Sequence, residues 1–357
     1  MVGLKGNQSG IDGGVEMTSS TPISASMQRI LKDSFGRVIN NLRISVTDRC
    51  NFRCRYCMPE QGMTWLAKKE LLTYEEITRL TRIFSSLGVK KLRLTGGEPL
   101  MRKDLHTLVG ELASIGGIED IALTTNGYFL AEQAVHLSRA GLRRINVSLD
   151  SLDAAVFNEV TRRDYYDRVW KGIEAAESAG VRPIKLNVVL LRGVNDREIA
   201  AFARLARTKP YIIRFIEFMP IGSDDGWSAD QVVPTKEVIA AIEHEIGMRL
   251  VPVEMHGAQP ADRYAAEDGL GEFGFISSVS EPFCDHCNRV RITSDGKLRA
   301  CLFSLEETDL KALLRNGAGE DVIAEAIQKT VWGKQEGHLI NQPGFIRPER
   351  TMSQIGG

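Results

Sequence analysis

Residues 42–59 read LRISVTDRCNFRCRYCMP and join a strand-like segment directly to three cysteines. In residues 42–47 apolar side chains alternate with polar ones, which is typical of a β-strand whose two faces meet different surroundings. Cys50, Cys54 and Cys57 follow this segment almost at once. We therefore expect the three cysteines to lie together in the loop after the first strand.

The alternation of strand-like and helix-like segments continues to about residue 218. Further strands are predicted over residues 91–95, 121–125, 144–149, 184–190 and 212–218. Residues 74–87 and 167–180 carry apolar side chains at helical spacing. Six such units in a row predict a parallel sheet with right-handed crossovers, closed or partly closed as a barrel. An open doubly wound sheet is the alternative. In a barrel, the loop after the first strand lies at the face where active sites are found.

The predicted strands have one apolar and one polar face, whereas strands of a filled barrel are usually apolar on both. Helices would cover the apolar face, so the polar face would line the interior. Buried cations need anionic partners, which predicts an anionic ligand inside the barrel. A solvated sheet face is the alternative, and Ile216 interrupts the polar face of the sixth strand. The cations on this face are Arg43, Lys91, Arg93, Lys185 and Arg214.

A second group of cysteines, Cys284, Cys287 and Cys301, surrounds a predicted hairpin at residues 290–302. Two distant sets of three cysteines argue against a disulfide framework. The spacing of the first set favours an iron–sulfur cluster over zinc or free thiols. The second set leaves zinc and iron–sulfur equally open, because a histidine could complete a zinc site. The candidate histidines are His256, His286 and His338.

The composition argues against several classes of protein. The chain has 357 residues, of which 43% are hydrophobic and 25% charged, and its net charge is −1. This balance disfavours a general nucleic-acid or acidic-membrane binder. No apolar run approaches the roughly 18 residues of a membrane span. Residues 1–26 show no secretion signal, so the expected location is the cytoplasm, where reduced thiols can serve metals or catalysis.

Two motifs together resemble those of the radical S-adenosylmethionine (SAM) family. One is the first cysteine set with Tyr56 before its last member, and the other is Gly96-Gly97-Glu98-Pro99 at the end of the second strand. Further segments resemble the branch of this family that acts on GTP in molybdenum cofactor biosynthesis. They are residues 42–59, LRLTGGEPLM (92–101), TTNG (124–127), RINVSLD (144–150), RFIEFM (214–219), FCDHCNRVR (283–291) and the terminal Gly356-Gly357.

The resemblance covers about residues 35–310 and the tail. Residues 1–34 fall outside it and are expected to form a disordered leader, since their first part is rich in Gly and Ser. The resemblance implies a partial (βα)6 TIM-type barrel at 35–220. It further implies a C-terminal cluster and substrate-binding region at 221–357, ending in an active-site tail. The two cysteine sets would each hold a [4Fe-4S] cluster, with SAM bound to the first and the guanine of GTP to the second.

The implied reaction converts GTP to (8S)-3′,8-cyclo-7,8-dihydroguanosine 5′-triphosphate, the first step of molybdopterin cofactor biosynthesis. It would need an external electron donor and would feed a cyclic pyranopterin monophosphate synthase. The family also suggests a homodimer, with no nucleic-acid or membrane partner. The alternatives are another radical SAM enzyme with an auxiliary cluster, such as a peptide-modifying enzyme, or a zinc-stabilised nucleic-acid-binding or scaffold protein.

The resemblance also implies roles for individual residues. Tyr56, Gly97, Ser148 and Met219 match positions that contact SAM. Arg289, Arg291, Gly356 and Gly357 match catalytic positions. Without the resemblance, the two arginines fit a solvated hairpin face and the glycines a frayed end. The residues that would contact GTP are Arg43, Lys91, Arg93, Thr124, Lys185, Arg214, Arg289 and Arg291. Asp150 and Glu217 are better explained as hydrogen-bonded strand ends than as an acid/base pair.

Overall fold

A computed structural model describes residues 30–222, 227–254 and 259–356 of the chain. The six predicted strands are all present, and each begins and ends within two residues of its predicted bounds. They are β1 (Asn41–Ser45), β2 (Lys91–Thr95), β3 (Asp120–Thr125), β4 (Arg144–Ser148), β5 (Ile184–Leu190) and β6 (Tyr211–Glu217). The α-helices that alternate with them are α1 (Tyr74–Ser86), α2 (Leu105–Ala113), α3 (Leu130–Arg139), α4 (Ala154–Thr161), α5 (Tyr166–Ser178) and α6 (Ile199–Thr208).

The C-terminal region adds strands to both edges of this six-stranded sheet. Strand β10 (Arg289–Ile292) pairs in parallel with β1, and β9 (Glu272–Ile276) pairs in parallel with β6. The sequence predicted the partial barrel and its extension correctly, but not that the extension would prolong the parallel sheet. The outer strands are antiparallel: β7 (Leu250–Pro252), β8 (Asp262–Ala266), β11 (Lys297–Arg299) and β12 (Thr308–Asp309). The expected hairpin is β10–β11.

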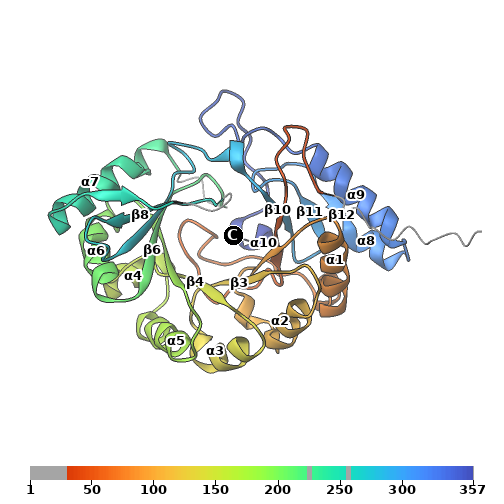
Figure 1. Ribbon diagram of the computed structural model, residues 1–357, viewed down its shortest axis with the longest axis horizontal. Helices are drawn as coiled ribbons and strands as arrows, with labels where there is room; N and C mark the ends of the chain where they lie inside the picture. Colours follow the sequence, from red (N-terminus) through yellow and green to blue (C-terminus); the bar gives the residue numbers. More distant parts are fainter. Residues whose placement is uncertain (1–29, 223–226, 255–258, 357) are drawn as a thin grey trace, which may run out of the picture.

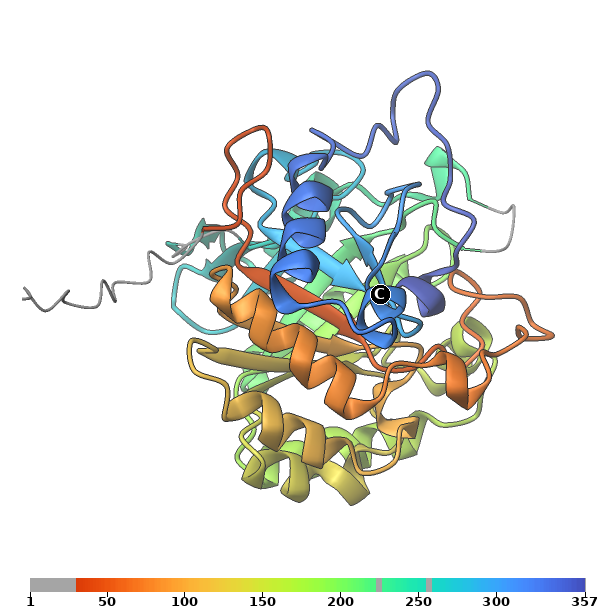
Figure 2. The ribbon, with the colours of Figure 1, turned by 90° about the vertical axis from the view of Figure 1, so that its right-hand side faces the viewer.

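The remaining helices also belong to the C-terminal region. They are α7 (Thr235–Ile246), α8 (Leu310–Arg315), α9 (Glu320–Trp332) and α10 (Met352–Ile355). Helix α9 lies beside α1 (Figure 2), and Arg79 of α1 donates a hydrogen bond to the carbonyl of Ala318 just before α9. Helix α10 is different, because it lies inside the ring of strands (Figure 1). The C-terminal region therefore both covers the outside of the barrel and enters it.

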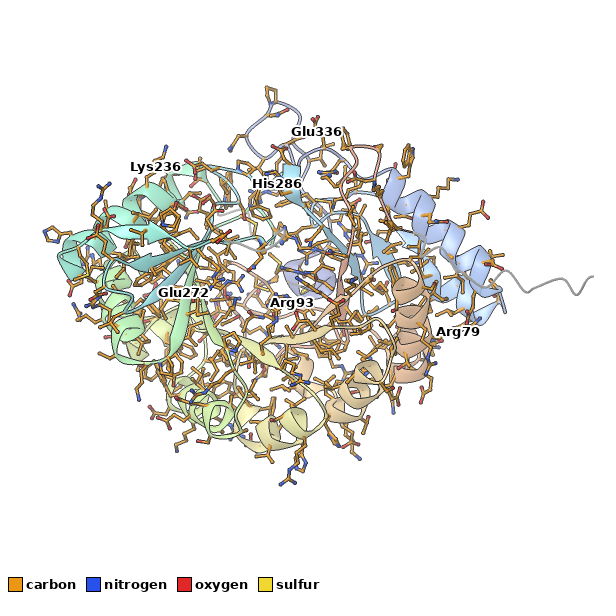
Figure 3. The ribbon with its side chains drawn as sticks, in the orientation of Figure 1. Arg79, Arg93, Lys236, Glu272, His286 and Glu336 are labelled. Atoms are coloured by element: carbon orange, nitrogen blue, oxygen red, sulfur yellow. The ribbon has the colours of Figure 1, made fainter. Side chains whose placement is uncertain are left out.

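The two faces of the strands are used as the sequence predicted. The apolar side chains of Leu42, Leu92 and Leu186 are 0–1% exposed and lie in the main hydrophobic core beneath the helices. The helices form the outer layer around the curved sheet (Figure 1). The polar side chains face inward: Arg93 lies within the barrel in Figure 3, whereas Arg79 lies outside it on α1. The open doubly wound sheet is therefore not the fold.

The expected leader ends earlier than residue 34. Leu31 is 1% exposed, and its N–H donates to the carbonyl of Leu87 at the end of α1 (3.0 Å). Asp33 is buried and pairs with Arg37. Residues 30–34 thus pack against the barrel because Leu31 adds to its core, and residues 1–29 of the predicted leader lie outside the described residues.

No α-helix among the described residues has the length and apolar character that crossing a membrane requires.

Two helices of the outer layer approach unusually closely at Gly172 of α5. A Cβ atom at this position would lie 2.3 Å from the carbonyl oxygen of Gly127, which precedes α3. Real Cβ atoms do not approach backbone oxygen this closely, so the glycine is what allows α5 to pack here.

We expect Gly172→Ala to destabilise the protein by about 1–3 kcal/mol, because α5 must move away from the backbone at Gly127. Gly110→Ala is the matched control, since a Cβ atom at this position inside α2 would have nothing within 4 Å of it. That substitution should be neutral or stabilising by up to about 1 kcal/mol. Urea unfolding monitored by circular dichroism measures both. Equal stability of the two variants would contradict the packing argument.

Candidate active site

Both cysteine sets open onto one cavity of about 260 Å³ at the carboxyl ends of the parallel strands. Its lining includes all six cysteines together with residues from the ends of β1 to β6 and from the C-terminal region. The loop after each parallel strand reaches this end of a barrel, so side chains distant in sequence converge here. The two cysteine sets therefore face a common space.

The first cysteine loop is held by backbone hydrogen bonds and by an arginine. The N–H of Cys57 donates to the carbonyl of Cys54 (2.9 Å), and Arg53 donates to the carbonyls of Cys50 and Phe52 (both 2.7 Å). Burial raises the pKa of Cys50 and of Cys57 to about 12. The loop thus presents three neutral thiols that only a strongly electropositive group, such as a metal, would deprotonate.

The second cysteine set is held by one arginine far away in the sequence and by one close to it. Arg37 donates to the carbonyl of Cys284 (2.9 Å), and Arg289 donates to the sulfur of Cys287 (3.7 Å). Burial acts to raise the pKa of Cys287, but the charges of Arg289 and Lys334 outweigh it and lower this pKa to about 6. The electropositive surroundings therefore favour the thiolate form that metals bind.

The histidines considered as a fourth zinc ligand are placed differently. His338 lines the cavity, and its Nδ1 accepts a hydrogen bond from the N–H of Ile340 (3.3 Å). His286 is exposed at the surface (Figure 3), and His256 lies outside the described residues. Among the residues that the structure describes, no three His, Cys, Asp or Glu side chains surround a single metal ion. A cluster needs another arrangement, because each cysteine binds its own iron atom.

The residues matched to SAM contacts, Tyr56, Gly97, Ser148 and Met219, all line the cavity. The hydroxyl of Tyr56 donates to the carboxylate of Asp150 (2.7 Å). A Cβ at Gly97 would lie 2.4 Å from the carbonyl oxygens of Asp48 and Arg49, so the loops after β1 and β2 can meet only with glycine there. This close approach brings the Gly-Gly-Glu-Pro segment alongside the first cysteine loop.

Glu98, in the same Gly-Gly-Glu-Pro segment, serves to hold the backbone of this loop in place. Its carboxylate accepts hydrogen bonds from the hydroxyl of Thr125 (2.6 Å) and from the N–H groups of Asn126 (2.6 Å) and Leu100 (2.9 Å). Burial raises its pKa to about 7. Glu98 therefore ties the loop after β2 to the end of β3 and fixes the position of Gly97.

Five arginines of the interior face line the same cavity, together with Thr124. They are Arg43, Arg93, Arg214, Arg289 and Arg291. None of them forms an ion pair with a carboxylate of the described residues: the bonds of Arg93 and Arg214 go to Thr124 (3.5 Å) and Asn146 (3.0 Å). Buried unpaired cations are costly, so the group is arranged for an anionic ligand.

The pKa values of these arginines also indicate a site for an anionic ligand. Burial, followed by the charges of Arg289 and other neighbouring cations, lowers the pKa of Arg291 to about 9. Burial and the charges of Arg144 and Arg289 lower that of Arg214 to about 10. Both values stay above neutral pH, so the guanidinium groups remain charged and repel one another. The buried Nε atoms of Arg43 and Arg214 also lack a hydrogen-bond partner within the described structure.

Lys91 and Lys185 do not line this cavity. They lie in a second cavity of about 380 Å³ at the amino ends of the strands, which Arg144 and Arg263 also line. Arg93 and Arg214 line both cavities and therefore stand between them. The sequence predicted a single cationic interior. The structure divides it into an upper cavity, which is the 260 Å³ cavity between the two cysteine sets, and a lower cavity, which is the 380 Å³ cavity at the amino ends of the strands.

The C-terminal tail enters the upper cavity. Arg291 donates to the carbonyl of Gly356 (2.8 Å), and a Cβ at Gly356 would lie 2.9 Å from the Cβ of Ser45. The N–H of Ser353 faces the sulfur of Cys57 and acts to lower its pKa, against the larger effect of burial. Gly356 is therefore not a frayed end, and its neighbour Gly357 lies outside the described residues.

Asp150 and Glu217 do not form a pair. Glu217 accepts bonds from Thr235, Val279 and Ser280 and does not line the cavity. Asp150 lines the cavity, and burial raises its pKa to about 6. Glu217 is thus a hydrogen-bonded strand end, as the sequence favoured.

Several residues of the site were not predicted from the sequence. Asn126 donates to the sulfur of Cys50 (3.9 Å) and to Asn51 (2.9 Å), and Lys334 and Phe283 line the cavity. Asn126 belongs to the TTNG segment at the end of a strand, which was a usable signal. No signal in the sequence marked Lys334, because a single lysine after a helix is ordinarily on the surface.

Comparison with protein families defines the class. Residues 44–206 match the Radical SAM superfamily, and residues 211–340 match the Molybdenum Cofactor Synthesis C family. The fold and the two matches identify the chain as a radical SAM enzyme.

Comparison with individual proteins identifies the family within the radical SAM superfamily. The chain is 48% identical over 327 residues to the GTP 3′,8-cyclase of Pelotomaculum thermopropionicum, covering 92% of this chain and all of that protein. It is 47% identical over 328 residues to that of Thermodesulfovibrio yellowstonii, with the same coverage. It is 44% identical to that of Streptomyces coelicolor, covering 92% of this chain and 96% of the relative. The chain belongs to the GTP 3′,8-cyclase family.

A solved structure agrees on the fold. Native anSMEcpe with bound AdoMet matches with a TM-score of 0.54 at 12% identity, covering 86% of this chain and 92% of that one. The likeness supports the barrel and its extension, and no more.

Arg350 clamps the tail before it enters the cavity. Its guanidinium pairs with Asp295 (2.9 Å) and Glu307 (2.7 Å). We expect Arg350→Ala to release α10 and to expose the bonds before Met352 and Ile355 to thermolysin. Limited proteolysis followed by mass spectrometry of the C-terminus measures this. Arg347→Ala is the control, since its hydrogen bond to the carbonyl of Trp227 is long (3.5 Å). Equal resistance of both variants would refute the clamp.

Lys185 predicts a pH dependence of stability. Burial, Arg214 and Arg144 lower its pKa from 10.5 to about 7. Between these values the unfolded chain binds one more proton than the folded chain, so the contribution of Lys185 to the free energy of unfolding rises with pH. The rise is at most about 1.4 kcal/mol per pH unit.

We therefore expect the nucleotide-free protein to gain stability from pH 7 to 9 relative to Lys185→Met. Urea unfolding at the two pH values measures the difference between the proteins. A constant difference would show that Lys185 is not desolvated in the folded state.

Proposed function

We propose that this chain converts GTP to (8S)-3′,8-cyclo-7,8-dihydroguanosine 5′-triphosphate, the first step of molybdopterin cofactor biosynthesis. One observation carries the proposal: a group of buried arginines without carboxylate partners among the described residues lies in one cavity between two sets of three cysteines. GTP is a polyanion, and guanidinium groups bind phosphates through paired hydrogen bonds. The membership of the GTP 3′,8-cyclase family supports the same reaction.

The cysteine sets fit two [4Fe-4S] clusters. Each set supplies three sulfur ligands to the lining of the cavity, which would leave one iron of a four-iron cluster open to another ligand. When bound, the first cluster would supply the electron for the reductive cleavage of SAM, which starts the radical reaction on GTP. Cys50, Cys54 and Cys57 would hold this cluster, and Cys284, Cys287 and Cys301 the second, beside which the guanine of GTP would bind.

The residues around the first set would hold SAM. Tyr56, Gly97 and Met219 follow β1, β2 and β6, Ser148 ends β4, and all four line the cavity. Because Glu98 and Asp150 fix the backbone at Gly97 and the hydroxyl of Tyr56, these contacts are positioned before SAM arrives. Preorganised contacts bind a ligand without the loss of freedom that ordering would cost.

The two cavities suggest how GTP lies. The guanine and ribose would occupy the upper cavity, near Thr124 and Arg289, with Arg291 contacting the substrate and the tail. The triphosphate would extend past Arg43, Arg93 and Arg214 toward Lys91 and Lys185 in the lower cavity. This orientation would place the most negative part of the substrate beside cations that line both cavities.

The tail would complete the reacting site. Gly356 reaches Ser45 and Thr95, between the first cysteine loop and Arg291, and Gly357 would extend from it. A reactive intermediate requires that water be excluded and its target be held in contact. A tail without side chains at its last two positions can approach the substrate closely.

Several partners belong to the same proposal. An external electron donor would reduce the cluster of the first set, and a cyclic pyranopterin monophosphate synthase would take the product. We also propose a homodimer and a cytoplasmic location. The interior cations argue against the peptide-modifying alternative, because a peptide chain would not neutralise them.

Anaerobic reconstitution tests the reaction directly. We expect about eight irons per chain, as two four-iron clusters require, and formation of 5′-deoxyadenosine from SAM that depends on GTP. Iron analysis and chromatography of the products measure both. Four irons, or 5′-deoxyadenosine formation indifferent to GTP, would refute the proposal.

A substitution separates the GTP contacts from the SAM contacts. We expect Arg93→Ala to weaken GTP binding at least about tenfold, because a charge-assisted contact to phosphate is lost, and to leave SAM binding within about twofold. Arg79→Ala is the control, since Arg79 lies outside the barrel on α1 (Figure 3). Equilibrium binding of each ligand measures the effects. An equal loss for SAM and GTP would refute the assignment of Arg93.

A further inference from the structure

Lys334 is a lysine in the interior of the protein, beyond the end of α9. It is 2% exposed and belongs to the lining of the upper cavity. Its ammonium group donates hydrogen bonds to the carbonyls of Arg289 (3.1 Å) and Ala300. Arg289 follows Cys287 by two residues, and Ala300 directly precedes Cys301. A single side chain thus joins the two backbone segments that carry these cysteines.

The charge of Lys334 has no carboxylate partner within the described part of the chain. No ion pair there includes it, and its two bonds to protein are to neutral carbonyls. Lysine is almost never fully buried without a counter-charge, because its desolvation is costly. Lys334 acts electrostatically on the sulfurs of Cys284 and Cys287, where its charge favours the thiolate form.

We propose that Lys334 is the built-in counter-charge of a cluster held by Cys284, Cys287 and Cys301, and that it raises the reduction potential of that cluster. The inference rests on the second cluster of the proposed function. Three thiolates on a four-iron core carry net negative charge, and one-electron reduction adds another negative charge. A fixed cation nearby favours the reduced form, since it stabilises the more negative state more strongly.

The geometry distinguishes Lys334 from the substrate-binding arginines. Two of its three N–H bonds are committed to backbone carbonyls, so only one remains for another group. It therefore cannot act as a phosphate clamp in the way a guanidinium does. Its place between the two cysteine segments makes it a positioning residue that also sets the local potential.

Lys334→Met tests this, because methionine keeps the length of the side chain without the charge. Lys329→Met is the matched control, since Lys329 is an exposed lysine in the last turn of α9. The full chain is reconstituted with iron and sulfide and titrated with dithionite under electron paramagnetic resonance. A parallel titration in a background of Cys50→Ala, Cys54→Ala and Cys57→Ala isolates the second cluster.

We expect the reduced-to-oxidised ratio of the second cluster at a fixed potential to fall about tenfold in Lys334→Met, which for one electron is about 59 mV. The first cluster and Lys329→Met should be unchanged. Thermal unfolding before reconstitution supplies a second readout. Without iron the buried charge has no partner, so Lys334→Met should be at least as stable as the parent, and reconstitution should stabilise it less than the parent.

Two results would overturn the inference in distinguishable ways. If the parent holds four irons only, the proposed function fails and Lys334 has no cluster to neutralise. If the parent holds eight irons but Lys334→Met keeps the same potential, or loses stability equally with and without iron, Lys334 is a structural residue and the proposed function stands.

Discussion

The structure depends on the repulsion among cations inside the barrel that have no carboxylate partner among the described residues. Arg93, Arg214 and Arg291 are 5–8% exposed, yet the described residues offer them no carboxylate. Hydrophobic burial on the outer face of each strand must offset this cost, and the apolar side chains of the strands are almost completely buried against the helices. The molecule therefore holds its binding site in a state that is ready for an anion but unfavourable without one.

This constraint explains why the interior is built from two ends of the chain. Strands β1 to β6 contribute one arc of polar side chains, and β10 brings Arg289 and Arg291 to the edge beside β1. Both parts line the cavity. The tail adds a third element, because Gly356 lies between Ser45 of β1 and Arg291 of β10. The relatives in the GTP 3′,8-cyclase family match nearly the whole length of the chain, so both parts belong to the shared sequence.

Much of the fold followed from the sequence, because strand periodicity depends on local neighbours. The alternation in residues 42–47 predicted both the strand and its polar inner face, and the cysteine spacing predicted the loop after it. That Cys50 and Cys284 line one cavity fits the resemblance, which implied that SAM and GTP bind at the two cysteine sets. The resemblance to a family, rather than periodicity, supplied the residues for SAM and GTP, and their roles remain predictions.

Other features could not be predicted, since they depend on long-range pairing. The local sequences of β10 and β9 do not indicate that these strands pair in parallel with β1 and β6. Lys91 and Lys185 lie away from the upper cavity because they stand near the amino ends of their strands. The residue type alone does not reveal this position. Lys334 escaped prediction for the same reason, because its surroundings come from residues 289 and 300.

The pairing of β1 with β10 has a consequence for how the protein forms. Asn288, beside β10, donates a hydrogen bond to Asn40, beside β1, across a sequence separation of 248 residues (2.7 Å). During synthesis, β1 cannot pair with β10 until most of the chain has left the ribosome. Such distant contacts slow folding and leave strand edges exposed. The strand that leads into the first cysteine loop therefore lacks one of its two neighbours until β10 has been synthesised.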